Sequence, residues 1–411
     1  MIIDYTLGNF GPFKDDVTLS LEATNISEHP ENIIRSDNGD VLSSAIIFGP
    51  NAAGKSYLVD GLLALSKVVS SRGGNDTLGR AYVPYCVSKE CRDAPVRMRL
   101  RLLIDGIRYD YRIEYDAKEI VHESLHHYPN GRRAKVFERG GPETFQKARK
   151  KVADFTASDT TYLTMASIGK DPVCVRVRDA IVGITFAASD SDILIEETCK
   201  MCDDDPTMRS LLIRALQTAD LGIEDFSYKE GQIPLSEIRD ILPPSVYEDA
   251  RSGSDSIATM DVFVKHGFKD TDEEGRTMQM DSESSGTRCL FGLMGMLIPV
   301  IRDGGVLVID ELGSHLHPRL TRWVVQMFAS YNNRNGAQLI ANTHDLGLMD
   351  IDELLRRDQI WFVNKDRDSG SSDLYCLSDF DGVRKDTDVL KAYLNGRYDA
   401  MPVVLHRGVL P

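Results

Sequence analysis

Short apolar runs that end at a glycine, an acidic residue or an amide recur near both ends of the chain. The clearest are SSAIIFG at 43–49, GVLVID at 305–310 and AQLIAN at 337–342. Unbroken apolar runs of this kind are typical of strands buried on both faces of a parallel sheet. Stretches with helical spacing follow two of them, at 57–69 and 320–331. The pattern predicts an α/β fold with a parallel core sheet.

Residues 96–115 show the other pattern, in which apolar and polar side chains alternate on both sides of Asp105-Gly106. That dipeptide favours the tight turn of a hairpin, so the N-terminal third is predicted to contain an antiparallel β subdomain. Successive side chains of a strand point to opposite faces, which places three arginines on one face. These are Arg97, Arg99 and Arg101. Their face is either a solvated sheet surface or a surface for nucleic acid or a partner.

The middle of the chain lacks both patterns. Residues from about 136 to 280 carry many charges and include helical stretches such as 207–219, which predicts a helical insertion lobe. We therefore expect a single head over 1–411, whose N-terminal lobe, about 1–135, holds the hairpin. The last part, about 281–411, is expected to begin with a long helix and to end in strands.

The composition is that of a soluble globular protein, with 42% hydrophobic and 27% charged residues in 411 positions. No signal peptide is visible, and the longest apolar-rich run, 289–301, is too short for a membrane span. Seven cysteines without framework spacing favour a cytoplasmic protein. We interpret Cys199 and Cys202 as ordinary helix cysteines, because no second pair completes a zinc site. A formal net charge of −15 disfavours a surface that binds nucleic acid throughout.

The first apolar run leads into GPNAAGKS, which fits the phosphate-loop pattern G-x-x-x-x-G-K-[ST]. In such a loop, backbone N–H groups at a helix N-terminus hold the β- and γ-phosphates of a nucleotide. Lys55 adds a charge worth roughly 4 kcal/mol at about 4 Å in an effective dielectric of about 20. Ser56 is placed to offer a hydroxyl to Mg²⁺. The predicted nucleotide-binding residues are Gly49, Pro50, Asn51, Ala52, Ala53, Gly54, Lys55 and Ser56.

Two later strands end in residues suited to hydrolysis. Asp310 ends GVLVID, where we expect it to reach Mg²⁺ through water, and Glu311 follows as the candidate general base. A surface acid or helix cap is the alternative for Glu311 taken alone. His344 follows the strand AQLIAN and is placed to bond the γ-phosphate and orient the attacking water. These residues are expected at the strand ends that neighbour the phosphate loop.

A long apolar helix is predicted just before GVLVID, and it opens with Ser284, Ser285, Gly286 and Thr287. Free N–H groups and a serine hydroxyl at a helix start form an anion site. A simple helix cap is the alternative.

Together, GPNAAGKS, ESSGTR, VIDE and the histidine of NTHD resemble ABC-type ATPases, whose signature motif L-S-G-G-Q closes over ATP held by another subunit. Ser284 matches the serine and Gly286 the second glycine, while Glu283, Ser285 and Thr287 depart from the motif. Four further segments narrow the resemblance to the branch of SMC proteins, RecF and OLD ATPases, and within it to stand-alone phage-defence ATPases such as AbiL, RloA and the ATPase subunit of PARIS. These are VIDELGSHLHP, LLRRDQIWFV, SSDLYCLSDF and KAYLNGRYDAMP. That group usually has glycine where Asp399 stands, and the glutamine that ABC-type heads carry after the phosphate loop is absent between 82 and 99.

The resemblance implies an ABC-type P-loop ATPase head with an N-terminal antiparallel β subdomain and a helical lobe inserted before the signature motif. It implies ATP and Mg²⁺ as ligands. It also implies a head-to-tail homodimer, or a higher oligomer of such dimers, in which Ser284, Ser285 and Gly286 of one copy face the phosphate loop of the other. ATP then closes the dimer, and hydrolysis by Glu311 and His344 releases it.

Three outputs of such a switch differ in their partners. The favoured interpretation is an anti-phage, abortive-infection scaffold that senses a phage protein and controls a separately encoded toxin or nuclease. The alternative is a DNA-maintenance ATPase similar to RecF, which the net charge disfavours and the basic segment 147–151 leaves open. A self-contained nuclease of the OLD kind is rejected, because the residues after His344 carry no suitable acidic constellation.

Overall fold

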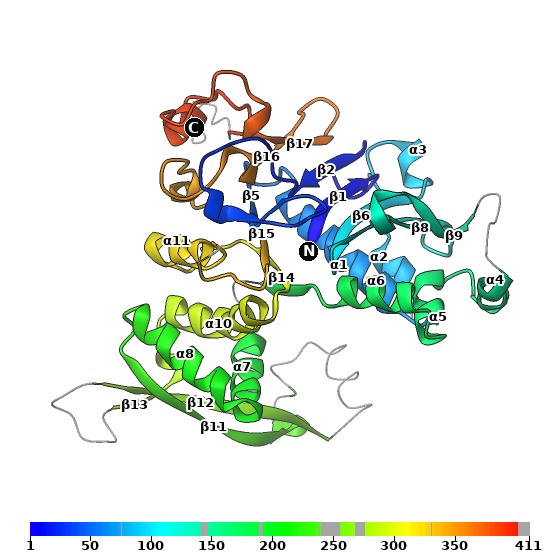
Figure 1. Cartoon of the computed structure of the whole chain (residues 1–411). Helices are drawn as coiled ribbons and strands as arrows, with labels where there is room; N and C mark the ends of the chain where they lie inside the picture. The colour runs from blue at the N-terminus through cyan, green and yellow to red at the C-terminus, as the bar shows by residue number, and fades with distance from the viewer. Residues whose placement is uncertain are drawn as a thin grey trace, which may run out of the picture. The chain divides into compact units, whose positions relative to one another are not determined.

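The computed structural model describes residues 1–74, 76–140, 147–188, 192–237, 239, 255–267, 276–329 and 331–401 (Figure 1). The chain divides into two compact units. Unit 1 takes Met1–Ser189, Val300–Ser314 and Pro318–Pro411. Unit 2 takes Asp190–Pro299 and His315–His317. Among the described residues, no helix has both the length and the apolar character that a bilayer crossing requires.

Unit 1 contains a six-stranded sheet in the order β10-β14-β15-β5-β16-β17. Its strands are β5 (Ser44–Phe48), β10 (Thr185–Ala188), β14 (Val306–Asp310), β15 (Gln338–Asn342), β16 (Ile360–Lys365) and β17 (Ser372–Cys376). All neighbours pair in parallel except β16 and β17. The three apolar runs form β5, β14 and β15, and β5 and β15 are buried along their whole length. The predicted α/β fold with a parallel core sheet is confirmed.

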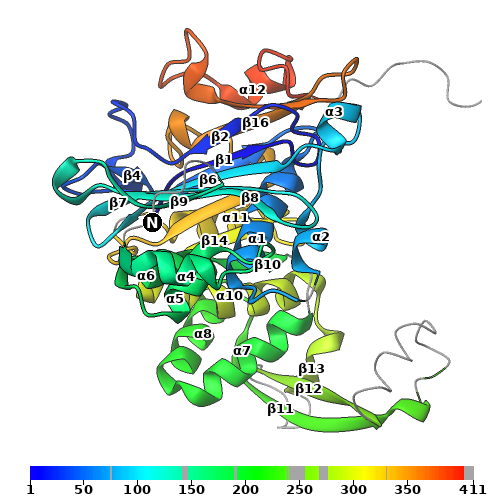
Figure 2. The ribbon, with the colours of Figure 1, turned by 90° about the vertical axis from the view of Figure 1, so that its right-hand side faces the viewer.

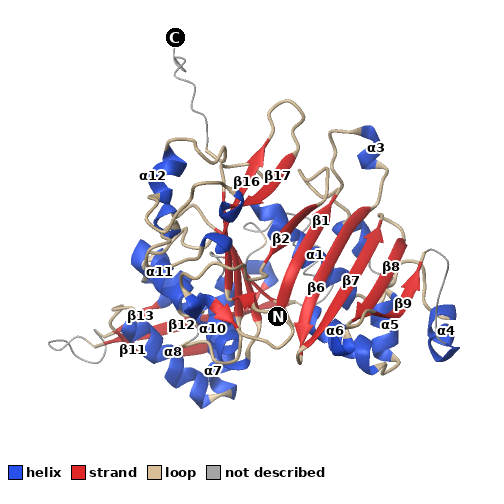
Figure 3. Ribbon diagram, turned by 45° about the horizontal axis from the view of Figure 1, so that its top comes forward, coloured by secondary structure: helices blue, strands red, loops and turns tan. Residues whose placement is uncertain are grey.

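The second sheet of unit 1 is antiparallel, in the order β2-β1-β6-β7-β8-β9, and its strands lie side by side in Figure 3. The strands are β1 (Ile2–Gly8), β2 (Val17–Ser20), β6 (Val96–Ile104), β7 (Ile107–Tyr115), β8 (Ile120–His127) and β9 (Ala134–Arg139). Asp105 and Gly106 have φ values of 50° and 72°, as the predicted hairpin turn requires. The predicted antiparallel subdomain is confirmed. A separate short pair joins β3 (Ile33–Ile34) and β4 (Val41–Leu42).

The helices of unit 1 enclose a shared apolar core. Residues of both sheets and of α1 (Lys55–Ser70), α5 (Tyr162–Ile168) and α6 (Pro172–Val182) belong to one buried cluster. Smaller helices are α2 (Thr77–Ala81), α3 (Lys89–Arg92), α4 (Lys147–Asp154), α11 (Pro318–Gln326) and α12 (Val389–Leu394). The phosphate loop is thereby carried on two buried elements, β5 before it and α1 after it.

Unit 2 contains α7 (Asp192–Asp204), α8 (Pro206–Thr218) and most of α10 (Ser285–Asp303). Beside the helices lies an antiparallel sheet of β11 (Ile223–Pro234), β12 (Ser256–His266) and β13 (Thr277–Gln279), drawn in Figure 2. The region expected as a helical insertion lobe therefore contains a three-stranded sheet as well as helices. Residues 229–234 of β11 are all exposed, so the strand shows no alternation of apolar and polar positions that a sequence pattern reveals.

Candidate functional site

The phosphate loop connects β5 to α1 through two glycines in left-handed conformations. Gly49 has a φ of 152°, and a Cβ atom there would lie 2.3 Å from the carbonyl oxygen of Val363. Gly54 has a φ of 113°, and a Cβ atom there would lie 2.6 Å from Cγ of Pro12. Both positions therefore require glycine for conformation and for space. The close packing fixes the loop at the N-terminus of α1, where backbone N–H groups attract anions.

Lys55 is the first residue of α1 and is only 6% exposed. Its ammonium group donates hydrogen bonds to the carbonyl oxygens of Gly49 at 2.8 Å and Pro50 at 3.1 Å. Burial lowers the pKa of Lys55, while the nearby charges of Glu311 and Asp310 act in the opposite direction. The lysine charge is thus held inside its own loop and lies in the field of the two acids.

Ser372, on β17, supports the loop from a distant part of the sequence. Its hydroxyl donates a hydrogen bond of 2.6 Å to the carbonyl of Ala53, and its N–H donates to the carbonyl of Pro12 at 2.8 Å. Ser372 belongs to the segment SSDLYCLSDF, which carries part of the family resemblance, but no role was predicted for it. The structure supplies a physical reason for that segment, because this serine ties β17 to the phosphate loop.

Asp310 and Glu311 lie at the carboxyl end of β14 and are joined by Asn342 at the end of neighbouring β15. The side-chain oxygen of Asn342 accepts from the N–H of Glu311 at 2.8 Å, and its amide nitrogen donates to the carboxylate of Asp310. Asn342 is fully buried. Glu311 has a φ of 57°, a conformation that non-glycine residues adopt at a cost of order 1–3 kcal/mol and often at functional sites. Sequence reasoning missed Asn342, whose only signal is its place two residues before His344.

His344 follows β15 on a turn. The preceding residue, Thr343, forms hydrogen bonds to β5 and to the segment after β14. Thr343 donates its N–H to Ile47 at 3.1 Å and its hydroxyl to the carbonyl of Leu312 at 2.5 Å. Burial and the charge of Lys55 lower the pKa of His344, while Glu311 and Asp310 act to raise it. The parallel pairing of β14 with β15 and of β15 with β5 brings the phosphate loop, the two acids and His344 to one edge of the sheet.

A cavity of about 760 Å³ opens beside these residues. Its walls include residues 49–53 of the phosphate loop, His344 and the β16–β17 hairpin with Lys365 and Arg367. Cavities of several hundred Å³ with a few convergent polar groups are the usual form of small-molecule sites. The sequence did not indicate this contribution of the hairpin.

Ser284 and Gly286 lie in unit 2, at the start of α10. The hydroxyl of Ser284 accepts a hydrogen bond of 3.1 Å from the N–H of Thr287, which makes Ser284 the cap of the helix. A Cβ atom at Gly286 would lie 2.8 Å from the carbonyl oxygen of His315, so this position needs glycine. Ser284 and Ser285 remain exposed. The predicted helix start is confirmed, and its serine hydroxyl serves the helix as a cap.

The three arginines of β6 are neutralised by carboxylates. Arg97 pairs with Asp16 at 2.7 Å, Arg99 with Asp110 at 2.8 Å, and Arg101 with Asp4 and Glu22. Burial alone would raise the pKa of Asp110, but hydrogen bonds from Arg99 and Arg112 outweigh it and lower the pKa to about 2. Of the two interpretations of this face, the structure favours a solvated sheet surface.

Cys199 and Cys202 are buried within α7. Burial raises the pKa of Cys199 to about 12 and that of Cys202 to about 11, so both thiols stay protonated at neutral pH. Within the described ranges, no group of three or more His, Cys, Asp or Glu side chains is arranged to hold a metal ion. These observations agree with the interpretation of ordinary helix cysteines.

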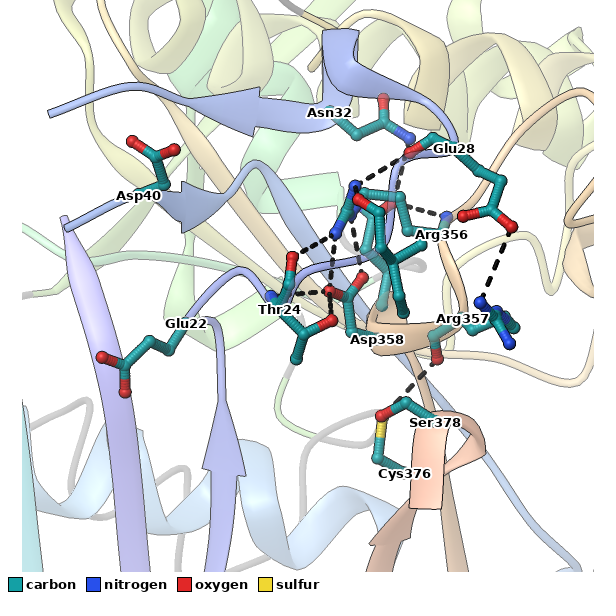
Figure 4. A network of polar contacts seen from close by, with 12 residues as sticks. Glu22, Thr24, Glu28, Asn32, Asp40, Arg356, Arg357, Asp358, Cys376 and Ser378 are labelled. Atoms are coloured by element: carbon teal, nitrogen blue, oxygen red, sulfur yellow. Dashed lines mark hydrogen bonds and ion pairs between the residues drawn. The ribbon is translucent and has the colours of Figure 1, made fainter. Parts of the chain in front are cut away.

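Arg356, in the segment LLRRDQIWFV, is the centre of a network of hydrogen bonds (Figure 4). Arg356 is fully buried and donates to the carbonyls of Thr24, Ile26 and Glu28 at 2.7–3.1 Å. Its guanidinium also pairs with Asp358 at 2.8 Å, and Asp358 accepts from both the N–H and the hydroxyl of Thr24. The network ties the N-terminal loop to the start of β16, the strand beside β5.

The departure at Asp399 also has a structural explanation. Asp399 has a φ of 52°, in the left-handed region that favours glycine. Aspartate tolerates this region better than most residues. The backbone at Asp399 is therefore one that glycine also adopts readily.

The phosphate loop, the parallel sheet and the residues at its carboxyl edge together define a fold of the P-loop ATPase class. Residues 200–350 match a family model described as "AAA domain, putative AbiEii toxin, Type IV TA system". The matched range includes Ser284, Asp310, Glu311 and His344 and leaves out the phosphate loop. No curated protein matches the chain.

Several solved structures are similar to the chain. An SMC head bound to the C-terminal winged-helix domain of ScpA has 15% identity and a TM-score of 0.45, and covers 91% of this chain and 97% of its own. The SMC head of Thermotoga maritima has 12% identity and a TM-score of 0.41, with 91% and 98% covered. The recombination mediator RecF-ATPrS of the RecFOR pathway has 11% identity and a TM-score of 0.37, with 91% and 98% covered. These values do not assign a function to the chain.

Proposed function

We propose that this protein is an ATP-hydrolysing switch whose two copies close around ATP. The observation that carries the proposal is the meeting of Lys55, Glu311 and His344 at one edge of the parallel sheet. These residues come from three separate segments that follow the parallel neighbours β5, β14 and β15, which supports the proposal. A phosphate cradle, an acid pair and a histidine in one place are the parts that hydrolysis of a nucleotide requires.

The residues present fit ATP and Mg²⁺. Gly49 to Ser56 form a loop that the two glycines keep narrow, and its N–H groups and Lys55 suit phosphate oxygens. Ser56 and Asp310 offer the oxygen ligands that Mg²⁺ prefers. When bound, Mg²⁺ neutralises phosphate charge. Asn342 holds the Asp310 carboxylate through its amide, so this acid is oriented before any ligand arrives.

Glu311 acts in this proposal as the general base for the attacking water. Its backbone is fixed by Asn342 in a left-handed conformation, which determines where the side chain leaves the chain. His344 forms one further hydrogen bond at the γ-phosphate in this proposal. General-base catalysis is worth typically about 10²–10⁴-fold in rate.

Ser284, Ser285 and Gly286 serve in this proposal as the signature segment of a second copy. Ser284 and Ser285 are exposed at the N-terminus of α10, which supports contact with an anion that another chain presents. ATP then joins two copies, and hydrolysis lets them separate. The free energy that drives closure comes from the tighter binding of ATP to the closed dimer than to the separate copies.

We further propose an anti-phage role, in which the switch senses a phage product and controls a separate toxin or nuclease in the cytoplasm. The resemblance of VIDELGSHLHP and LLRRDQIWFV to phage-defence ATPases supports this role. The description of the matching family model, which names a toxin and a toxin–antitoxin system, is a second line of support. The neutralised arginine row is a third, since it removes one candidate surface for DNA.

The experiment is the Glu311→Gln variant, measured by hydrolysis and by sedimentation with and without ATP. We expect hydrolysis to fall by about 10²–10⁴-fold while ATP binding persists and a dimer accumulates. Hydrolysis at the wild-type rate would overturn the role of Glu311. A variant that binds ATP and stays monomeric would overturn the two-copy site.

A DNA-maintenance function similar to RecF's is the second candidate, and one observation favours it. A hollow of about 720 Å³ along α1 is lined by Lys67, Arg72 and Arg80, and also by Asp60. Clustered cations are the groups that bind phosphates and release counterions. Tight, ATP-dependent duplex binding at physiological salt that Arg80→Ala weakens and Arg97→Ala does not would favour this function over the defence role.

A further inference from the structure

His266 ends β12 and reaches the residue that precedes the signature segment. His266 is 6% exposed, and its Nε2 lies 2.8 Å from a carboxylate oxygen of Glu283. An ionised carboxylate only accepts hydrogen bonds, so the Nε2 atom must carry the proton. The contact links a strand end to Glu283, the direct neighbour of Ser284.

Short-range bonds also hold this segment in place. The N–H of Glu283 donates to the carbonyl of Met280 at 3.0 Å, and Ser284 caps Thr287. Each of these bonds spans three residues. The bond from His266 spans seventeen residues and ties Glu283 to the end of β12. The direction of the exposed N–H groups at the start of α10 therefore depends on where β12 ends.

The strand that carries His266 pairs with β11 along a long ribbon and, close to His266, with the short strand β13. β11 and β12 pair from Ile223 with His266 to Pro234 with Ser256, and the outer half of β11 is exposed. At the base of the ribbon, Phe226 packs edge-on against Phe291 of α10, with ring centroids 5.2 Å apart. The ribbon thus contacts α10 along its side through Phe226 and at its N-terminus through His266. A shift of the ribbon base moves both contacts.

We propose that His266 is the positioning residue through which the β11–β12 ribbon orients Ser284 to Gly286. The inference rests on the proposed function, because it concerns the signature segment of the two-copy ATP site. His266 itself need not touch the nucleotide. It holds Glu283, and Glu283 fixes the chain direction at which the helix N-terminus meets the phosphate of the second copy.

The test compares dimerisation in the Glu311→Gln background, with ATP, for three variants. His266→Leu removes the donor, whereas His266→Gln keeps an amide N–H where Nε2 lies. Asp225→Asn is the matched control, because it weakens an ion pair with Arg209 at 2.7 Å in the same unit without touching Glu283. We expect His266→Leu to weaken the dimer about tenfold, the size of a charge-assisted hydrogen bond. His266→Gln and Asp225→Asn should stay near the parent, and nucleotide binding by the monomer should not change.

Glu283→Gln tests the same contact from the other side if His266→Leu folds poorly, and it should also weaken the dimer. An unchanged dimer in both variants, or equal weakening by Asp225→Asn, would overturn the positioning role. If the Glu311→Gln parent itself stays monomeric, the proposed function fails, and hydrogen exchange then decides the role of His266. Faster exchange of the amides of 284–287 in His266→Leu supports the role, and unchanged exchange overturns it.

Discussion

Charged side chains lie both at the carboxyl edge of the parallel sheet and on one face of the antiparallel sheet. The two regions differ in the groups to which these side chains bind. At the edge, Lys55 donates to carbonyls of its own loop, and in the described part of the chain no carboxylate forms an ion pair with it. On the face, each arginine of β6 binds a carboxylate directly. The first arrangement leaves charge to interact with a ligand, and the second uses charge to hold strands together.

The strongest test of this contrast is Lys55→Ala. The lysine charge is worth roughly 4 kcal/mol to a phosphate at about 4 Å, so we expect nucleotide affinity to fall by about 10³-fold. Titration with a fluorescent nucleotide measures the loss. Lys118→Ala, an exposed lysine on the turn between β7 and β8, is the control and should bind as the wild type does. Equal affinity in Lys55→Ala would remove the distinction between the two regions.

Asn342→Leu tests whether the edge is organised for catalysis as well as for binding. The variant removes the amide that orients Asp310 and Glu311, and we expect kcat to fall by about 10- to 100-fold with a much smaller change in KM. Gln338→Leu is the control, since this buried amide lies at the other end of β15 and bonds Ile2 and Leu42. It should lower stability without lowering kcat. A similar kcat loss in both variants would indicate damage to the strand instead.

Asp110→Asn tests the face, where we expect a loss of stability and no loss of ATP binding. The pKa of Asp110 is lowered to about 2, so its contribution is present above the unfolded value and is lost as pH falls. A shift from about 3.9 to about 2 corresponds to roughly 2 kcal/mol at pH 7. Urea unfolding should show this difference at pH 7 and a shrinking one between about pH 4 and pH 2. A difference that does not depend on pH would contradict the ion-pair explanation.

Arg97→Gln should have the smallest effect, because Arg97 and Asp16 are 37% and 55% exposed at the end of the arginine row. Exposed pairs of this kind contribute about 1 kcal/mol or less. We expect a change in unfolding free energy below that value and no change in duplex DNA binding in a gel shift. Loss of DNA binding would return this face to the candidate interfaces.

The strands of the site were predictable from the sequence because burial leaves a pattern. β5, β14 and β15 each contain an apolar run, and GPNAAGKS has a spacing that chemistry explains. The outer half of β11 is exposed on both faces, so its residues obey no alternation and the ribbon was missed. The roles of Asn342 and Ser372 were also missed, because a single amide or hydroxyl has no motif and its partners lie far away in the sequence. The acids that neutralise the arginines were not predicted either, because they also lie far from the arginines in the sequence.

The central claim is that one ATP site takes its phosphate loop from one copy and its signature segment from another. Mixing two inactive variants tests it directly. Lys55→Ala lacks the loop charge, and Ser284→Asp keeps a helix cap but places a negative charge where the phosphate would bind. In an equal mixture half of the dimers are mixed and carry one intact site of two, so hydrolysis should recover to about a quarter of the wild-type rate. A mixture that forms ATP-dependent dimers and hydrolyses no faster than either variant alone would contradict the claim.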